Sequence, residues 1–166
     1  NLAEPISPYG IAKLAQTHFA KYFFKKYGMP SVTLRLFSVY GPLEEPGRLI
    51  YDIMTHILKK NTLKLASKKV KRDFIFVDDV VDVILLMIDY ECDFEIFNVG
   101  SGKSYSFQKI LQIFEKIYDV KLDKSFEENK ANFIPKMELD ISKIKQKTKW
   151  YPKISLEEGL KKYYSN

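Results

Sequence analysis

Residues 7–13 read Ser-Pro-Tyr-Gly-Ile-Ala-Lys, and this stretch predicts the start of a long helix. A serine oxygen can accept hydrogen bonds from the unpaired amides of a first helical turn, and proline fits that turn because it has no amide hydrogen. Gly28, with a proline two residues later, supplies the matching end. We therefore expect a helix that begins at Ser7 or Pro8 and runs to about Tyr27.

Tyr9 and Lys13 are separated by one helical turn, so they should project from the same face of this helix. An ammonium group beside a phenol stabilises the phenolate form, which lets a tyrosine exchange protons as an acid or base. The spacing alone also fits a plainer interpretation, a partly buried aromatic ring beside a solvated cation. The flanking sequence has to decide between the two.

Composition indicates one globular domain of soluble type. The chain has 166 residues, of which 46% are hydrophobic and 14% aromatic, enough for a substantial core. No apolar run approaches the ~20 residues that a bilayer-spanning helix needs, and the first residues do not resemble a signal peptide. The single Cys92 cannot form an internal disulfide. We expect a cytoplasmic protein without a membrane partner.

The net charge of +6 does not by itself indicate a nucleic-acid-binding protein, because the lysines are scattered along the chain. The one tight basic cluster, at 68–72, is interpreted as a solvated surface, with Arg72 as the exception discussed below. His18, His56 and Cys92 lack the spacing of a metal-ligand set, so we expect no metal site.

Strand and helix patterns alternate along the chain, which predicts an α/β fold. We expect strands at 31–37, 62–66, 74–77 and 95–99, and helices at 48–60, 79–88, 106–118, after Asp140 and from Ser155, with 123–137 irregular. Asp79 is expected to cap its helix with Asp82 in the first turn, and Glu158 should complete a capping box with Ser155. A complete dinucleotide-binding sheet needs about six strands, so this sheet is predicted to be incomplete.

Several ordered blocks extend the pattern of residues 7–13: Leu-Arg-Leu-Phe-Ser-Val-Tyr-Gly-Pro at 34–42, Arg-Asp-Phe-Ile-Phe-Val-Asp-Asp-Val at 72–80, Phe-Asn-Val-Gly-Ser-Gly at 97–102, and Trp-Tyr-Pro-Lys-Ile-Ser-Leu-Glu-Glu-Gly-Leu at 150–160. Together they resemble the extended short-chain dehydrogenase/reductase family, specifically the NAD-dependent nucleotide-sugar epimerases, dehydratases and decarboxylases, of the UDP-glucose 4-epimerase type. The resemblance covers nearly all 166 residues.

The resemblance implies an incomplete Rossmann-type parallel sheet that lacks its N-terminal strands, plus a small α/β substrate-binding lobe. Residues 1–42 would be the end of the NAD-binding domain, and 43–166 mainly the lobe, with 94–100 returning as a Rossmann strand. In the family the first helix contributes to a dimer interface, and here it carries an apolar face that includes Ile11, Phe19 and Phe23. The resemblance therefore implies a homodimer of the complete protein.

The resemblance also implies roles for particular residues. Tyr9 would be the acid/base for a sugar hydroxyl, and Lys13 would bind the nicotinamide ribose beside it. Phe37 would line the nicotinamide and Ser38 the nucleotide-diphosphate sugar; many relatives carry asparagine where Ser38 stands. The implied cofactor is NAD, with NADP left open because the discriminating residue would follow an early strand outside this chain.

Three cations match the family's phosphate-binding positions to different degrees. Arg72 matches the arginine that binds the substrate diphosphate, a role suited to the fork-like donors of a guanidinium. Its alternative is an ordinary surface charge or a salt bridge to Asp73. Arg48 is a weaker match, and Lys130 stands where relatives carry a further phosphate-binding arginine.

Two local motifs receive plainer interpretations. Gly100-x-Gly102 follows a strand and precedes a helix, but the third glycine of a pyrophosphate cradle would fall at Tyr105, whose bulk obstructs the required packing. Asp78 and Asp79 suggest a carboxylate pair, yet capping of the following helix explains at least one of them.

Three functional hypotheses stay open. The chain is the C-terminal portion of an enzyme that oxidises a nucleotide sugar transiently, or a remnant that binds nucleotide sugars or a protein without catalysis, or a basic nucleic-acid-binding protein. A Gly-rich strand-turn-helix encoded directly upstream would favour the first over the second. The choice between epimerase, dehydratase and decarboxylase depends partly on residues beside a Ser or Thr partner that lies outside this chain.

Overall fold

A computed structural model describes residues 4–59, 62–65, 67–126 and 134–163. In chain order its elements are α1 (Pro8–Tyr27), β1 (Ser31–Leu36), β2 (Ser38–Tyr40), α2 (Leu49–Lys59), β3 (Leu63–Leu65), β4 (Lys71–Phe76), α3 (Val77–Ile88), β5 (Phe94–Val99), β6 (Ser104–Ser106), α4 (Phe107–Tyr118), β7 (Lys124–Phe126), β8 (Lys136–Met137), α5 (Ser142–Thr148) and α6 (Leu156–Lys162). The predicted α/β class is confirmed, because parallel strands are joined through helices.

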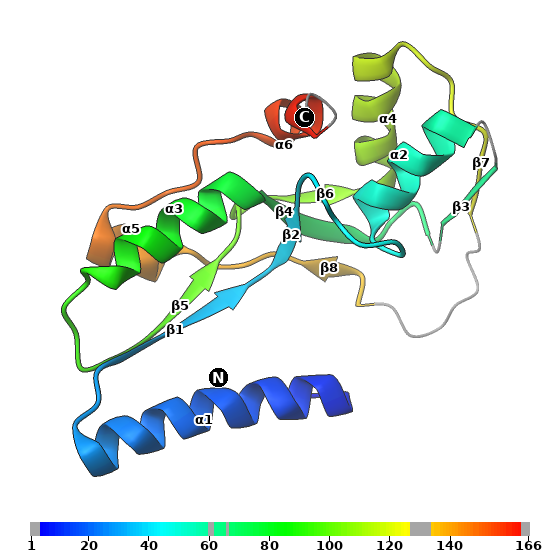
Figure 1. Ribbon diagram of the computed structural model, residues 1–166. Helices are drawn as coiled ribbons and strands as arrows, with labels where there is room; N and C mark the ends of the chain where they lie inside the picture. The colour runs from blue at the N-terminus through cyan, green and yellow to red at the C-terminus, as the bar shows by residue number, and fades with distance from the viewer. Residues whose placement is uncertain (1–3, 60–61, 66, 127–133, 164–166) are drawn as a thin grey trace.

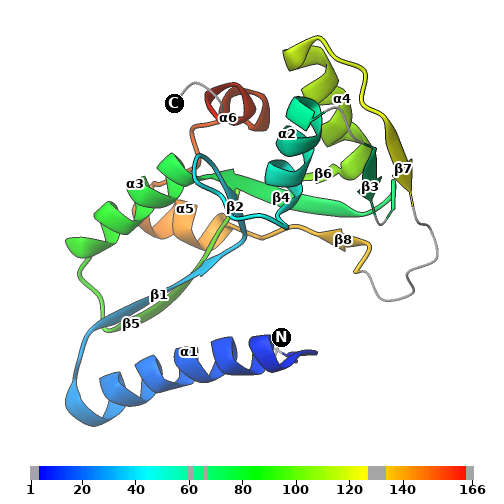
Figure 2. The same ribbon diagram turned by 45° about the vertical axis from the view of Figure 1, so that its right-hand side comes forward.

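Strands β1 and β5 form a two-stranded parallel sheet, in register from Ser31 opposite Phe94 to Leu36 opposite Val99. Helix α1 lies along one face of this pair, while α3 and α5 lie on the other (Figures 1 and 2). Within the described ranges no strand pairs with the second edge of β1. The pair is therefore an incomplete, open piece of a larger parallel sheet, as the sequence predicts.

The remaining strands build the lobe. Strand β4 lies at its centre, parallel to β2 and β8 and antiparallel to β6, and β3 and β7 form a separate parallel pair. Helices α2, α4 and α6 gather beside these strands, away from α1 (Figure 1). The lobe and the open pair are continuous, because β2 follows β1 after a single residue.

The predicted helix ends of three helices are confirmed. The Ser7 side chain accepts a hydrogen bond at the start of α1, and Gly28 ends that helix with a φ of 66° in the left-handed region. Ser106 caps α4 in the same way as Ser7 caps α1. Ser155 and Glu158 form the expected capping box of α6.

The predicted role of Asp79 as a helix cap is wrong. Helix α3 begins directly after β4, so Phe76 occupies the N-cap position without a side-chain hydrogen bond and Asp79 lies inside the first turn. Its buried carboxylate accepts hydrogen bonds from the amides of Lys153 (2.9 Å) and Ile154 (3.0 Å). Asp82 lies beyond the first turn and pairs with the Lys153 ammonium at 2.9 Å. These carboxylates hold the C-terminal segment against α3.

Segment 123–137 is less irregular than predicted, because its described ends form β7 and β8. Strand β4 also begins earlier than expected, at Lys71, whose amide donates to the Pro135 carbonyl (2.8 Å). These strands are short and contain few apolar residues. They form because they pair with distant segments, more than because of their own composition.

Two hydrophobic clusters meet across β4, whose side chains alternate between them. Phe74 and Phe76 enter the larger cluster in the lobe, and Ile75 enters the smaller one under α3 and α5. The larger cluster also contains buried residues of α2, α4 and α6: Ile50, Ile53, Met54, Ile110, Leu111, Phe114, Leu156 and Leu160. It is tightly packed, since a Cβ added to Gly159 would overlap the Tyr40 hydroxyl oxygen.

Apolar side chains stay exposed on the two helices that flank the open pair. On α1 they include Ile11, Phe19 and Tyr22, and on α3 they include Val81, Ile84, Leu85 and Ile88. The α3 residues recur at helical spacing and therefore form one stripe. In the described part of the chain, no helix combines the length and the apolar character needed to cross a membrane.

Candidate active site

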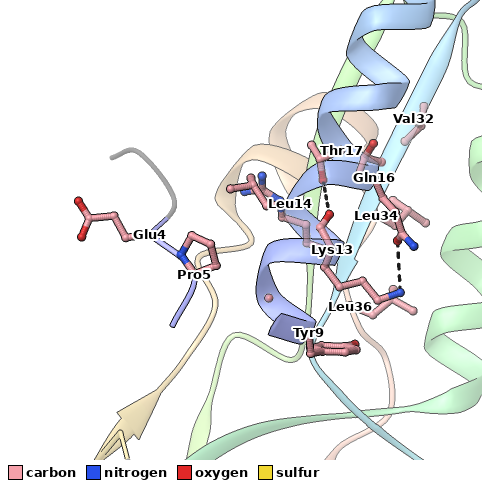
Figure 3. A pocket seen from close by; sticks show the side chains of 13 residues that line it. Glu4, Pro5, Tyr9, Lys13, Leu14, Gln16, Thr17, Val32, Leu34 and Leu36 are labelled. Atoms are coloured by element: carbon pink, nitrogen blue, oxygen red, sulfur yellow. Dashed lines mark hydrogen bonds between the residues drawn. The ribbon is translucent and has the colours of Figure 1, made fainter. Parts of the chain in front are cut away.

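A cleft of about 710 Å³ lies between α1 and the open edge of β1. Its lining comes from the segment before α1, the first turns of α1 and most of β1: Glu4, Pro5, Tyr9, Gly10, Lys13, Leu14, Gln16, Thr17, Val32, Thr33, Leu34, Arg35 and Leu36. Figure 3 shows Tyr9 and Lys13 on the side of α1 that faces Leu36. Both members of the predicted pair therefore line one hollow.

Tyr9 and Lys13 lie against each other. The Lys13 ammonium is 5.6 Å from the centroid of the Tyr9 ring, within the range of a cation–π contact. The same ammonium donates to Gln16 Oε1 at 3.3 Å. Tyr9 is 73% exposed, so its hydroxyl is open to a bound molecule. The two side chains point the same way, as an acid/base pair would require.

Helix α1 is fixed by contacts on its other residues. Thr17, which is buried, donates its hydroxyl to the Lys13 carbonyl at 3.3 Å. About two helical turns beyond Thr17, the Phe24 ring stacks on Phe94 of β5 with 6.5 Å between centroids. This stacking holds the helix beside the sheet, and the first turns of the helix present Tyr9 to the cleft.

Phe37 and Ser38 directly follow the last β1 residue that lines the cleft. The Phe37 amide donates to the Val99 carbonyl at 3.0 Å, which continues the β1 and β5 pairing by one residue. Ser38 begins β2 opposite Phe74 of β4. Both side chains are half-buried at the junction between the open pair and the lobe.

Arg72 lies on β4, two residues before the register partner of Ser38. One of its guanidinium nitrogens donates to the carbonyls of Lys71 and Ile134, both at 2.8 Å. Partial burial lowers the pKa of this guanidinium. The alternative of a salt bridge to Asp73 is not observed, because the Asp73 carboxylate is bound elsewhere.

Neither Arg72 nor Arg48 lines the Tyr9 cleft. Arg48 is exposed directly before α2, and its carbonyl accepts the Asp52 amide at 2.8 Å. Lys130 falls outside the described residues.

Sequence reasoning missed the role of Asp73. This fully buried carboxylate accepts hydrogen bonds from the Ser101 amide (2.8 Å), the Ser101 hydroxyl (2.6 Å) and the Gly102 amide (2.9 Å). The glycine loop after β5 thus already binds an anion from the chain itself, which agrees with the prediction that Gly100-x-Gly102 is not a pyrophosphate cradle. A carboxylate directly before the apolar run Phe74–Phe76 was the available signal.

Sequence reasoning also missed Gln16, although its position three residues after Lys13 on the helix indicates a contact. Within the described ranges, no group of histidine, cysteine, aspartate and glutamate side chains is arranged to hold a metal ion.

The open parallel pair, with a Tyr-x-x-x-Lys helix beside it, defines the class of Rossmann-type proteins related to nucleotide-sugar epimerases and dehydratases. The sequence profile described as GDP-mannose 4,6 dehydratase matches residues 1–163. The chain belongs to that family.

Individual relatives agree with this assignment. The chain is 29% identical to the UDP-glucuronate 4-epimerase of Thermodesulfobacterium geofontis, with 95% of this chain and 49% of that protein covered. It is 30% identical to an uncharacterised protein of Methanocaldococcus jannaschii, over 96% and 49% of the two chains. The chain thus spans about half the length of these relatives.

Solved structures show the same relation. The UDP-glucose 4-epimerase of Thermotoga maritima, bound to UDP-glucose, superposes with a TM-score of 0.86 at 32% identity, over 96% of this chain and 53% of that one. The UDP-glucuronic acid 4-epimerase of Bacillus cereus, in complex with UDP-glucuronic acid and NAD, gives 0.89 at 28% identity, over 98% and 53%.

Proposed function

We propose that this chain is the C-terminal portion of an NAD(P)-dependent nucleotide-sugar epimerase or dehydratase that oxidises its sugar transiently. The observation that carries the proposal is the placement of Tyr9 and Lys13 in one cleft against the open edge of β1. The similarity to epimerases over half of their length supports it.

In this proposal Tyr9 exchanges a proton with the sugar hydroxyl, and its exposed ring leaves the hydroxyl accessible. The Lys13 ammonium lies 5.6 Å from the centroid of that ring, beside the group that exchanges the proton. Gln16 restricts where the ammonium can lie. The pair therefore holds and moves a proton at the Tyr9 oxygen.

The residues present fit part of a nicotinamide cofactor. The cleft lies in the size range of about 300–1,000 Å³ that is typical of small-molecule sites, and its lining combines apolar β1 side chains with polar groups of α1. Tyr9, Lys13 and Phe37 would hold the nicotinamide end of NAD, and NADP is not excluded. When bound, the cofactor supplies the redox change. The pyrophosphate end requires a glycine-rich turn that this chain does not contain.

Ser38 and Arg72 are proposed to bind the nucleoside-diphosphate sugar, because β2 and β4 hold them close in register. Arg72 uses one nitrogen for two carbonyl contacts, so its remaining donors can bind a diphosphate. Arg48 and Lys130 are weaker proposals for the same ligand, because Arg48 lies apart from the β2 and β4 register pair and Lys130 falls outside the described residues.

The open edge of β1 is proposed to pair with the N-terminal half of the complete enzyme. A second hollow of about 400 Å³ lies on the α3 side of β1 and includes Val32, Leu34, Ile84 and Ile88. Further strands beside β1 would bury these side chains and the stripe on α3. We assign 1–42 and 94–100 to the cofactor domain and most of 43–166 to the lobe. The apolar face of α1 would then serve a homodimer.

Replacing Tyr9 by phenylalanine in the complete enzyme tests the proposal. The Tyr9→Phe variant should lose about 10²- to 10⁴-fold in turnover, because the proton-transfer group is gone while the ring stays. The matched control is Tyr27→Phe, which removes a hydroxyl from the far end of the same helix. Sugar-nucleotide conversion is followed by chromatography, and circular dichroism checks that both variants fold. Full activity in Tyr9→Phe would contradict the assignment.

The chain without an N-terminal half should show no NAD-dependent turnover, because the cofactor's pyrophosphate has no cradle. Calorimetric detection of tight NAD binding by the 166-residue chain would contradict this expectation. Binding of a nucleotide sugar by the chain alone, with no activity after the N-terminal half is restored, would instead favour a non-catalytic binding module.

A further inference from the structure

A third hollow, of about 420 Å³, lies beyond the C-terminal end of β5 and shares no lining residue with the Tyr9 cleft. We call it the lysine hollow. It is lined by Ser101, Lys103, Lys145, Lys149, Tyr151 and Pro152. Half of these residues are lysines, and none is acidic.

Lysines on and after α5 separate into two sets. Lys143 and Lys147 both pair with Glu95 of β5, at 2.5 and 3.2 Å. Lys145 and Lys149 alternate with them in sequence, so they project from a different side of the helix and line the hollow. The Glu95 carboxylate neutralises Lys143 and Lys147, whereas Lys145 and Lys149 face the lysine hollow.

The charges at the lysine hollow are not balanced by ion pairs. Within the described residues, no carboxylate forms a salt bridge with Lys103, Lys145 or Lys149, although nearby Lys153 has a partner in Asp82. The carboxylate of Asp73 lies under the glycine loop, but it is fully buried and bound to loop amides. Three ammonium groups around one concave surface create a positive potential that attracts anions.

Two of the three lysines are held by defined backbone. Lys149 ends α5 with a φ of 60°, a left-handed conformation that glycine adopts most easily. Its amide donates to the Lys145 carbonyl at 3.0 Å. Lys103 follows Gly102, which has a φ of 71° and packs against Ile141. A lysine kept in a conformation that costs free energy is a reason to look for a function.

We propose that the lysine hollow binds a small, soluble phosphorylated anion with two or more negative charges, such as a diphosphate group. Lysine ammonium groups bind phosphate as compact point charges, and the exposed Tyr151 hydroxyl can donate a further hydrogen bond. The hollow lies within the size range of small-molecule sites. This site is separate from the proposed active site and does not depend on it.

Calorimetric titration of the 166-residue chain with inorganic pyrophosphate at low ionic strength tests the site. The double variant Lys145→Ala/Lys149→Ala should weaken binding by at least about tenfold. The matched control, Lys143→Ala/Lys147→Ala, removes the same charge from the same helix and should change affinity by less than about twofold. Arg72→Ala is run in parallel and should leave this binding event in place. Absence of saturable binding, or equal weakening in both double variants, would overturn the proposal.

The single variant Lys149→Gly separates a binding role from a structural one. It should raise the melting temperature by a few degrees, because glycine relieves the left-handed conformation, and it should weaken pyrophosphate binding several-fold. A rise in melting temperature with unchanged affinity would overturn the role of Lys149. A second experiment measures binding of the chain to vesicles that carry a phosphorylated lipid headgroup. Vesicle binding that added pyrophosphate does not weaken would exclude a free anion as the ligand.

Discussion

The lobe and the open parallel pair contain similar apolar side chains, but only the lobe buries them. Phe114 of α4 is fully buried in the larger hydrophobic cluster, whereas Phe19 of α1 is 63% exposed. Helix α4 is strongly amphipathic, while α1 has its apolar residues spread more evenly around its circumference. The difference shows that the lobe supplies its own packing partners, whereas α1, β1 and α3 leave apolar surface exposed in this chain.

The two regions therefore differ in what their side chains contribute to stability. Side chains of the lobe are already removed from water, so each one contributes to the free energy of unfolding of the chain as it stands. The exposed residues of α1 and α3 contribute only when a further surface packs on them. Substitutions of buried residues in the lobe should lower the free energy of unfolding. Substitutions on the exposed faces of α1 and α3 should instead change association.

The largest effect is expected from Phe114→Ala. Removal of a fully buried ring from the larger cluster should lower the free energy of unfolding by about 3–5 kcal/mol, since the surrounding helices cannot close the cavity. Urea denaturation followed by circular dichroism measures this change. A loss below about 1 kcal/mol would mean that the lobe is loosely packed, and it would contradict the difference in packing between the lobe and the open pair.

A smaller, pH-dependent effect is expected from Glu44→Gln. Burial raises the pKa of Glu44 to about 7, although the Tyr163 hydroxyl (3.3 Å) and a backbone amide at the start of α2 partly oppose this. The folded state therefore binds the proton more tightly than the unfolded state. The stabilisation is complete at acid pH and is lost as the pH rises through about 7.

Glutamine keeps the hydrogen bonds of Glu44 but cannot ionise. Because the group is partly solvated, we expect the variant to be more stable than the parent by about 1 kcal/mol at pH 8, with the gain vanishing near pH 4. Thermal melts of both proteins across this range provide the measurement. An equal difference at the two pH values would exclude ionisation of Glu44 as the cause.

The smallest effect on stability is expected from Phe19→Ser on the exposed face of α1. The free energy of unfolding should change by less than about 0.5 kcal/mol, because the ring makes little buried contact in this chain. Association should decrease, which light scattering or ultracentrifugation can detect. A large loss of stability would show that this face of α1 is already packed. An unchanged association state would show that Phe19 does not contribute to a dimer interface.

The elements with local signals could be predicted from the sequence. The ends of α1, α4 and α6 follow from Ser7, Ser106 and Ser155, each of which accepts a hydrogen bond from its own helix. The incompleteness of the parallel sheet followed from the small number of strands. The Tyr9 and Lys13 pair was predicted from spacing and family blocks, and the structure brings the two groups together, while their catalytic role stays a proposal.

Features that depend on distant contacts could not be predicted. Asp79 looked like a cap because it stands near a helix start, yet its partners are amides more than seventy positions later in the chain. Strands β7 and β8 have polar sequences and form only because β3 and β4 offer free edges. The lysine hollow combines residues of a loop and a helix end, which no single stretch of sequence connects.

The buried carboxylate of Asp73 has a mechanical consequence. It belongs to the central strand of the lobe, and its hydrogen bonds reach the loop that leaves the open parallel pair. Any rotation of one sheet against the other about this point would strip those donors from a fully buried carboxylate, which costs free energy. The two sheets should therefore move as one body, and any shape changes should arise in peripheral loops.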